Sequence, residues 1–287
     1  MKRIICILMV LIVLMLSLSG CSSFNEVDED KVKDISDKIT QTIIDSVDKD
    51  KNGAERTESH KIEAKKLNKL DIKSSVGDIY VSAHDSDEAT VDIKITASSS
   101  SKEKSQELVD SFSYSVEEKW NTIEIDTRLD DVKLLSNNNM QTELTINIPK
   151  SIEAFIIELN VGEIIIDNTD GHFEINNNVG DIKVSNSTGS YNLKTDVGEI
   201  TLNNCKPSEK TELKTTTGDI KAVFLDISAA RSIKAETGVG DIDISTPDNS
   251  SYEAEINEFM KDKVVMFKGN QDTKIELKTG VGEIQFK

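Results

Sequence analysis

The sequence predicts an all-β protein whose chain winds as a parallel β-solenoid, and three observations support this. A short motif, Val-Gly-acid-Ile with Thr replacing Val in one copy, recurs seven times. From Gly162 to Gly240, successive motif glycines lie 18, 18, 20 and 22 residues apart. Each motif leads into short runs in which apolar and polar residues alternate. A fixed period of this length indicates stacked structural units.

One repeat, residues 179–195, shows what each unit contributes. Ile182 and Val184 flank a polar residue, and so do Tyr191 and Leu193. This period-2 alternation predicts two short strands with one buried face, separated by a turn rich in Ser, Asn and Gly. One unit cannot bury its apolar face alone, so the copies must stack. Equivalent strands then run parallel, about 4.8 Å apart, and right-handed winding is expected of parallel crossovers.

The second and third motif positions are the predicted corners of the stack. Glycine suits a corner with positive φ, and the corner glycines are Gly77, Gly162, Gly180, Gly198, Gly218, Gly240 and Gly282. The next residue is always acidic, which gives a predicted acidic edge of Asp78, Glu163, Asp181, Glu199, Asp219, Asp241 and Glu283. Two interpretations stay open: carboxylates that face solvent and bond nearby backbone amides, or an edge that binds cations such as calcium. Neighbouring carboxylates of such an edge repel each other by only about 1 kcal/mol per pair in water, which permits either interpretation.

The N-terminus has the pattern of a secretory signal. A basic start precedes an apolar run from Ile4 to Leu18, which is short for a membrane span. The sequence Leu18-Ser19-Gly20-Cys21 then resembles the lipobox of bacterial lipoproteins. That resemblance implies a signal peptide of residues 1–20, cleavage before Cys21, and a lipid on its thiol that holds the chain on the outer face of the cell membrane. The alternative is an ordinary secretory signal with an incidental cysteine.

Residues 21–59 are predicted to form a helical stalk and linker. Apolar residues from Val27 to Val47 recur mostly every three or four positions, which predicts an amphipathic helix. This helix could be a stalk, a cap on the solenoid or a dimer seam. Asp48, Asp50 and Asn52 then match the front of a calcium loop, but Ser59 replaces its bidentate glutamate. A solvated linker is therefore the competing interpretation.

Residues 60–150 read as an N-terminal β cap with early coils and a short helix over 102–112, and 151–287 as the regular repeats. A segment from Pro247 to Thr273 breaks the period, and its run 264–267 is predicted to be a strand of an extra coil. The chain ends one strand after the last corner, so an exposed edge and end-to-end self-association are a further hypothesis. Cys205, beside Pro207, is placed in a turn without a disulfide partner.

Three repeats carry a family resemblance: Val179-Gly180-Asp181-Ile182, Val197-Gly198-Glu199-Ile200 and Val239-Gly240-Asp241-Ile242. With the strand ending in Ile146-Asn147-Ile148-Pro149 before them, they resemble the bacterial putative-adhesin domain, a β-solenoid of unknown function. The resemblance spans about residues 60 to 287. It implies a surface location and a role in adhesion or envelope stress, and it supplies no catalytic residues. The segment at Pro247–Thr273 and the helical stalk depart from it.

Composition and motifs limit the function. With 52 acidic against 34 basic residues, the chain lacks the basic face that nucleic acid requires. No serine-hydrolase, phosphate-loop or zinc motif is present, and its scattered histidines are His60, His84 and His172. We expect a lipid-anchored structural or interaction module without a catalytic site or cofactor, which binds a cell-wall polymer or an envelope protein. The alternatives are a polysaccharide-acting β-helix enzyme and an accessory or sensor protein of an envelope-stress system.

Overall fold

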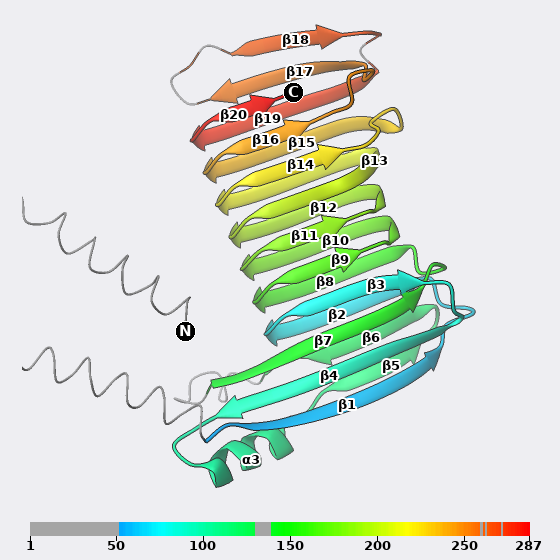
Figure 1. Ribbon diagram of the computed structural model, residues 1–287, viewed down its shortest axis with the longest axis vertical. Helices are drawn as coiled ribbons and strands as arrows, with labels where there is room; N and C mark the ends of the chain where they lie inside the picture. The colour runs from blue at the N-terminus through cyan, green and yellow to red at the C-terminus, as the bar shows by residue number, and fades with distance from the viewer. Residues whose placement is uncertain (1–51, 130–138, 259–260, 262, 271) are drawn as a thin grey trace, which may run out of the picture. The chain divides into compact units, whose positions relative to one another are not determined.

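The computed structural model describes residues 52–129, 139–258, 261, 263–270 and 272–287. These residues belong to one compact unit, Lys51–Lys287. The signal peptide, Cys21, the amphipathic helix, Asp48 and Asp50 all lie outside the described residues. Within the described ranges the chain is all-β and solenoid-like, with one helix, α3 (Lys102–Ser111) (Figure 1).

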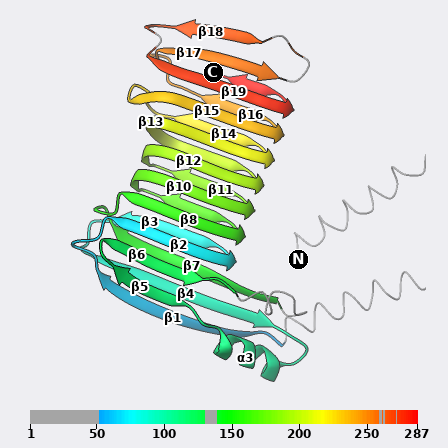
Figure 2. The same ribbon diagram turned by 180° about the vertical axis from the view of Figure 1, so that it is seen from behind.

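The strands form two sheets that meet at the corners of the stack (Figures 1 and 2). In spatial order, sheet A contains β1 (Ala54–Glu63), β4 (Glu88–Ser98), β7 (Asn139–Pro149), β3 (Ile79–His84), β9 (Ile164–Asp167), β11 (Ile182–Ser185), the start of β13 (Ile200–Thr217), β14 (Ile220–Phe224), β16 (Ile242–Ser245) and β20 (Ile284–Phe286). Sheet B contains β5 (Ser115–Lys119), β6 (Thr122–Thr127), β2 (Lys69–Val76), β8 (Ala154–Val161), β10 (Asp170–Val179), β12 (Thr188–Val197), the end of β13, β15 (Ala230–Val239), β19 (Thr273–Val281), β17 (Tyr252–Glu258) and β18 (Val264–Lys268).

The repeats stack with equivalent residues in register. Ile182 of β11 lies between Ile164 of β9 and Ile200 of β13, and both pairings are parallel. On sheet B, Leu193 of β12 pairs in parallel with Ile175 of β10. Each rung therefore contributes one strand to each sheet, and its inward side chains meet those of the rungs on either side. The right-handed winding expected from the sequence stays a prediction.

The interior is a continuous column of apolar side chains, because alternate residues of every rung point inward. Ile164, Ile182 and Ile200 are completely buried. Three aromatic rings continue the column: Phe173 stacks on Phe155 at a centroid distance of 4.7 Å and on Tyr191 at 5.1 Å. The Tyr191 hydroxyl donates a hydrogen bond to the Ser187 carbonyl at 2.8 Å, so its polar end is satisfied inside the core.

At the N-terminal end, spatial order departs from sequence order. The rung made of β2 and β3 lies between the rung of β6 and β7 and the rung of β8 and β9, because β2 pairs with both β6 and β8 and β3 with both β7 and β9. The chain thus forms the second rung before the first. β4 then pairs antiparallel with both β1 and β7.

The cap begins earlier than the sequence indicates. Residues 54–59, assigned to the linker, are the first part of β1, which pairs with β4 along its length. The sequence hides this strand because three of its five inward positions carry polar residues, Arg56, Glu58 and His60, where a period-2 pattern would show apolar ones.

The helix expected at 102–112 is present as α3. It begins at its N-cap Ser101, whose hydroxyl accepts a hydrogen bond from the Lys104 amide at 3.3 Å. Val109, on the inward side of the helix, is buried, and the helix packs against β1 and β4. It covers one face of the capping strands.

At the C-terminal end, the segment that breaks the period is a β-hairpin. β17 pairs in parallel with β19 on one side and antiparallel with β18 on the other. The prediction that residues 264–267 form a strand of an extra coil is therefore wrong. β19 lies between β15 and β17, so the hairpin extends sheet B beyond the last corner.

Cys205 is not in a turn, contrary to the sequence-based prediction. β13 continues through this region from sheet A into sheet B, and Cys205 is fully buried within it. Its sulfur lies 3.5 Å from the Val184 carbonyl oxygen. Burial raises the pKa of the thiol, which keeps it protonated and unreactive at neutral pH. Pro207, two residues further on, is typical of a turn, but here it lies within β13.

Burial makes the aromatic column sensitive to alkaline pH. Desolvation raises the pKa of Tyr191, whereas an unfolded chain ionises tyrosine near pH ~10. The buried, protonated Tyr191 therefore contributes its full stabilisation of the folded chain below pH ~10, and this contribution is lost as the pH rises further. We expect Tyr191→Phe to lower the free energy of unfolding by about 1 kcal/mol at neutral pH. Above pH ~10 the variant should lose stability less steeply than the wild type, by up to about 1.4 kcal/mol per pH unit.

Urea unfolding followed by circular dichroism from neutral pH to pH ~11 measures both effects. Parallel pH curves for the two proteins would show that Tyr191 ionises equally in the folded and unfolded chains.

Candidate functional site

The seven corner glycines form one continuous line through the stack. Their φ angles all lie between 127° and 150°, a region that side-chain-bearing residues rarely occupy. Each rung also approaches the previous one closely here: a Cβ atom on Gly180 would overlap the carbonyl oxygen of Gly162, and one on Gly198 that of Gly180. Glycine is required at this position both for the turn and for the rung spacing.

Backbone hydrogen bonds join each corner to the next on both sides of the glycine. The Gly180 amide donates to the Val197 carbonyl at 2.8 Å, and the Ile182 amide donates to the Glu199 carbonyl at 2.9 Å. The same two bonds recur at the corners that begin with Gly77, Gly162, Gly198, Gly218 and Gly240, although at Gly198 the acceptor for the glycine amide is Thr217. The ladder therefore passes through the corner without interruption.

The backbone amide of the acidic residue lies between the glycine amide and the isoleucine amide of each corner. Aspartates of the predicted acidic edge accept a hydrogen bond from this amide of the next rung. The Asp181 carboxylate accepts from the Glu199 amide at 2.9 Å. Equivalent bonds of 2.8 to 2.9 Å join Asp78 to Glu163, Asp219 to Asp241, and Asp241 to Glu283. In each case the side chain of the aspartate in one rung accepts a hydrogen bond from the backbone amide of the equivalent acidic residue in the next rung. A carboxylate bonded to a backbone amide is a charge-assisted contact, so these aspartates act as corner braces.

Glutamates of the same edge bind lysines that project from the next rung. Lys183 contacts Glu163, and its ammonium group also lies 3.6 Å from Asp181. Lys221 bonds Glu199 at 2.8 Å and lies 3.6 Å from Asp219. Bonding to the glutamates raises the pKa of both lysines. Lysines therefore interrupt what the sequence presented as a column of like charges.

A second set of corner residues is absent from the sequence-based prediction. In five rungs a buried side chain three residues before the glycine donates a hydrogen bond to the carbonyl of the corner glycine in the neighbouring rung. The donors are Asn177, Thr195, Thr215, Thr237 and Thr279, at 2.9 to 3.1 Å. The signal was available, since Thr or Asn recurs at this place in the motif, but it looks like ordinary β-strand composition.

The corner uses its polar groups within the stack. Partners in the neighbouring rung are present for the carbonyls of the corner glycines from Gly162 to Gly240 and for the amides of those from Gly77 to Gly240. The amides of four edge acids have such partners too: Glu163, Glu199, Asp241 and Glu283. Over the described ranges, no three His, Cys, Asp or Glu side chains gather in a metal-binding arrangement. Asn52, the described member of the predicted calcium loop, donates to the Ser100 carbonyl at 3.3 Å. Calcium binding at that loop or at the acidic edge stays a prediction.

The histidines are not brought together by the fold. His60 bonds the Tyr114 hydroxyl at 2.9 Å, the His84 ring accepts from the Ser86 amide at 3.0 Å, and His172 bonds the Ser190 hydroxyl at 2.6 Å. The arginines are engaged separately. Arg56 donates to backbone carbonyls, Arg128 pairs with Asp126, and Arg231 pairs with Glu209. These contacts are separate from one another, and none of them brings two carboxyl groups, or a carboxyl group and a histidine, together as a general acid and base would require.

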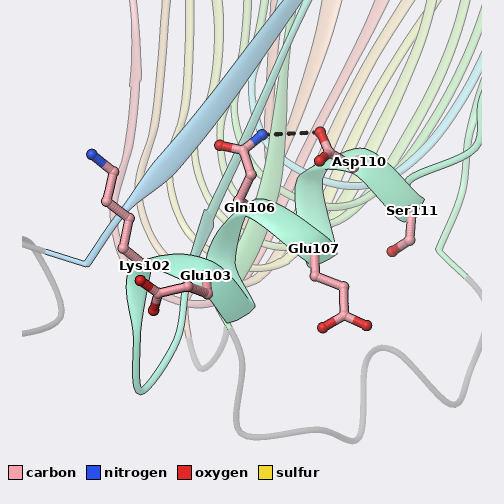
Figure 3. Close-up of a pocket in the computed structure, with 6 residues that line it drawn as sticks. All are labelled: Lys102, Glu103, Gln106, Glu107, Asp110 and Ser111. Atoms are coloured by element: carbon pink, nitrogen blue, oxygen red, sulfur yellow. Dashed lines mark hydrogen bonds between the residues drawn. The ribbon is translucent and has the colours of Figure 1, made fainter.

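A hollow of about 710 Å³ lies along α3, but its side chains do not converge (Figure 3). All six lining residues come from this helix: Lys102, Glu103, Gln106, Glu107, Asp110 and Ser111. Gln106 donates to Asp110 at 2.9 Å on one side of the helix, whereas Glu107 points to the other. A one-helix hollow of this kind offers no enclosed site.

A polar groove of about 340 Å³ lies at the turns opposite the glycine corners. Three asparagines one repeat apart line it, each with φ between 52° and 55°: Asn168, Asn186 and Asn204. Asn204 donates a hydrogen bond to the Asn186 side chain and Asn186 donates one to Asp167. The Asn168 side chain donates instead to the Ala83 carbonyl. Lys150 and Lys206 lie on its walls. The groove can offer amides and ammonium groups to a polar ligand.

The stack of rungs and its glycine corners define the class of the protein. Residues 151–287 match the family model described as Toastrack DUF4097. The matched residues are a little under half of the chain, and they are the ones in which the sequence predicted the regular repeats. A likeness of this kind concerns the fold and assigns no role to a residue.

Solved structures that resemble the chain are distant. A putative cell adhesion protein from Clostridium sporogenes is 15% identical with a TM-score of 0.36, covering 81% of this chain and 99% of that one. A putative adhesin from Bacteroides fragilis is 18% identical, with a TM-score of 0.37 and coverages of 81% and 97%. A putative lipid binding protein from Parabacteroides distasonis is 13% identical with a TM-score of 0.37, covering 81% of this chain and 97% of that one.

At such low scores and identities, the names of these structures say nothing about what this chain binds. No curated protein matches the sequence. Among the helices of the described ranges, none has the length and apolar character that crossing a bilayer requires.

Replacing a corner glycine tests the close approach of the rungs. We expect Gly198→Ala to lower the free energy of unfolding by about 3 kcal/mol or more, because alanine is strained at φ 150° and its Cβ overlaps the Gly180 carbonyl. Asp196→Ala, at an exposed position two residues away, should change it by less than about 0.5 kcal/mol. Equal effects in chemical denaturation would show that the glycine line does not set the spacing.

The threonine bonds can be tested with neighbouring residues of the same type. Thr215 is buried and donates to Gly198, whereas Thr216 is exposed. We expect Thr215→Val to cost about 1–2 kcal/mol of unfolding free energy, since the Gly198 carbonyl loses its donor without a change of side-chain shape. Thr216→Val should cost less than about 0.5 kcal/mol. Equal urea midpoints for the two variants would exclude this role.

Proposed function

We propose that the chain is a cell-surface, lipid-anchored interaction module, in which a right-handed parallel β-solenoid presents binding surfaces outside the membrane without catalysing a reaction. The observation that carries this proposal is the corner itself. Its repeated carboxylates, which would be the obvious candidates for acid–base or metal chemistry, are bonded to backbone amides and lysines of adjacent rungs. Repetition here serves to hold the stack together.

The absence of a converging set of reactive groups within the described ranges supports the same proposal. A glycosidase needs two carboxyl groups placed across a cleft, and a metalloenzyme needs clustered ligands. Neither the hollow along α3 nor the polar groove places two carboxyl groups across an enclosed cleft, and the described residues hold no metal cluster. The polar groove along Asn168, Asn186 and Asn204 is a surface suited to hydrogen bonding with an extended polar partner.

The lipobox supports the location. Leu18-Ser19-Gly20-Cys21 follows an apolar signal segment, and a diacylglycerol on Cys21 would hold the chain at the outer face of the cell membrane. Residues 22–51 then lie between that anchor and the described strands. A module in this position meets cell-wall polymers and other envelope proteins, which are the partners we propose.

Fatty-acid labelling tests the anchor. In a bacterial host, the wild-type chain is expected to incorporate a labelled fatty acid, and Cys21→Ser is expected to abolish the label because the thiol is its point of attachment. Ser22→Ala, one residue along, should keep the label. An unmodified N-terminus of the mature wild-type chain by mass spectrometry would exclude a lipid anchor.

Incubation of the anchored chain with native cell envelope separates the candidate roles. Retention of an intact polymer or an envelope protein supports an interaction module. Shortening of the polymer during incubation, absent in a boiled control, would instead establish a polysaccharide-acting enzyme.

A further inference from the structure

The C-terminal hairpin leaves an unusual sheet edge. β18 contains four consecutive apolar residues, Val264, Val265, Met266 and Phe267, whose side chains are 38% to 59% exposed. Among the described residues this is the only run of adjacent exposed large apolar side chains. β18 pairs with β17 on one side, and no described strand pairs with its other side. An apolar strand with one open side is a template for pairing with another strand.

The other described edges of the stack are protected. β5, the first strand of sheet B, ends in Glu117, Glu118 and Lys119. β1, the first strand of sheet A, is rich in charged residues, and α3 packs against it. The last strand of sheet A, β20, has three residues, and its Ile284 amide donates to Glu258 at 2.7 Å. Charges, a helix and a side-chain cap thus block three edges in ways typical of proteins that avoid strand addition, whereas the four residues Val264 to Phe267 of β18 carry no charge and the strand has a charged residue only at its end, Lys268.

We propose that β18 is a self-association site, at which two copies of this chain pair antiparallel through β18 about a two-fold axis. The axis passes beside Met266, so Met266 faces its own copy, Val265 faces Phe267, and Val264 faces Lys268. This register pairs all five residues of the strand and keeps each side chain on the same face of sheet B in both copies. It also places an aromatic residue opposite a β-branched one, a favourable cross-strand pair.

The second copy fits this edge better than an unrelated strand because the apolar run is self-complementary. Lys263 and Lys268 bracket the run, and in the Met266-centred register no lysine faces another. Lys263 is already paired with Glu255 at 2.5 Å, and Lys268 lies over the Tyr252 ring at 5.8 Å, so both charges are held beside the strand. Sheet B would continue unbroken from one copy into the other.

The same comparison of edges predicts a closed dimer rather than a filament. Head-to-tail stacking would bring β18 against the charged strands β5 or β1 of the next copy, where apolar residues would face charges. Isologous pairing uses the one open edge of each copy and leaves none for a third. One five-residue strand pair is a small interface, so the dimer is expected to be weak, with a dissociation constant in about the micromolar range.

Cysteine cross-linking in the full chain tests the register. In Met266→Cys the two new thiols face each other across the axis and should form a disulfide-linked homodimer under mild oxidation. In Val264→Cys the two thiols lie about 13 Å apart along the strands and should not link. Cys205 is buried, and Cys6 and Cys21 are replaced by serine in every variant, so no other thiol competes. The absence of a Met266→Cys homodimer in a protease-resistant protein, equal linking at Val264→Cys, or linking of Met266→Cys to a protein of different mass would each overturn the proposal.

A charge on the outer face of β18 tests the strand itself. Val265→Lys in the Met266→Cys background should reduce the yield of linked dimer at least tenfold, because lysine replaces the partner of Phe267. Val223→Lys in the same background is the matched control, since Val223 on β14 is 44% exposed and Val265 is 43% exposed. An undiminished yield with Val265→Lys, or an equal loss with Val223→Lys while both proteins keep the wild-type melting temperature, would overturn pairing through β18.

Discussion

The close approach of one glycine to the next is the constraint on which this structure depends. At each corner the chain turns with positive φ and lies so near the previous rung that a single Cβ atom would overlap its carbonyl oxygen. That contact fixes the rung spacing at one side of the stack. Because the spacing is fixed, the isoleucines that follow each corner fall into register with their equivalents, and the column of buried side chains follows from it.

The corner also explains why repeated acids need not indicate chemistry. Aspartate has the reach to accept from the amide of the next rung, and the longer glutamate instead meets a lysine there. Threonine or asparagine closes the remaining carbonyl from the buried side. A corner whose donors and acceptors are matched in this way adds rigidity to the stack. The surfaces that we propose for partners lie elsewhere, on the polar groove lined by Asn168, Asn186 and Asn204 and on the edge strand β18.

The two ends of the stack solve the problem of open edges differently. At the N-terminal end, β1, β4 and α3 cover the first rungs with antiparallel strands and a helix. At the C-terminal end, the hairpin of β17 and β18 extends only sheet B, while β20 ends sheet A with a bonded amide. A stack of regular repeats always has two open ends, because the first and the last rung each leave the backbone groups of one side unpaired.

The sequence by itself determined the all-β class, the seven corners and the pairs of inward residues such as Ile182 and Val184, because a period-2 pattern and a fixed repeat are local signals. It also located the short helix over 102–112, which is α3. Tertiary structure alone decided that β2 and β3 lie between β6–β7 and β8–β9, that β18 turns back on β17, and that Cys205 is buried. These features depend on which distant strands pair, and strand pairing is set by contacts that no stretch of neighbouring residues records.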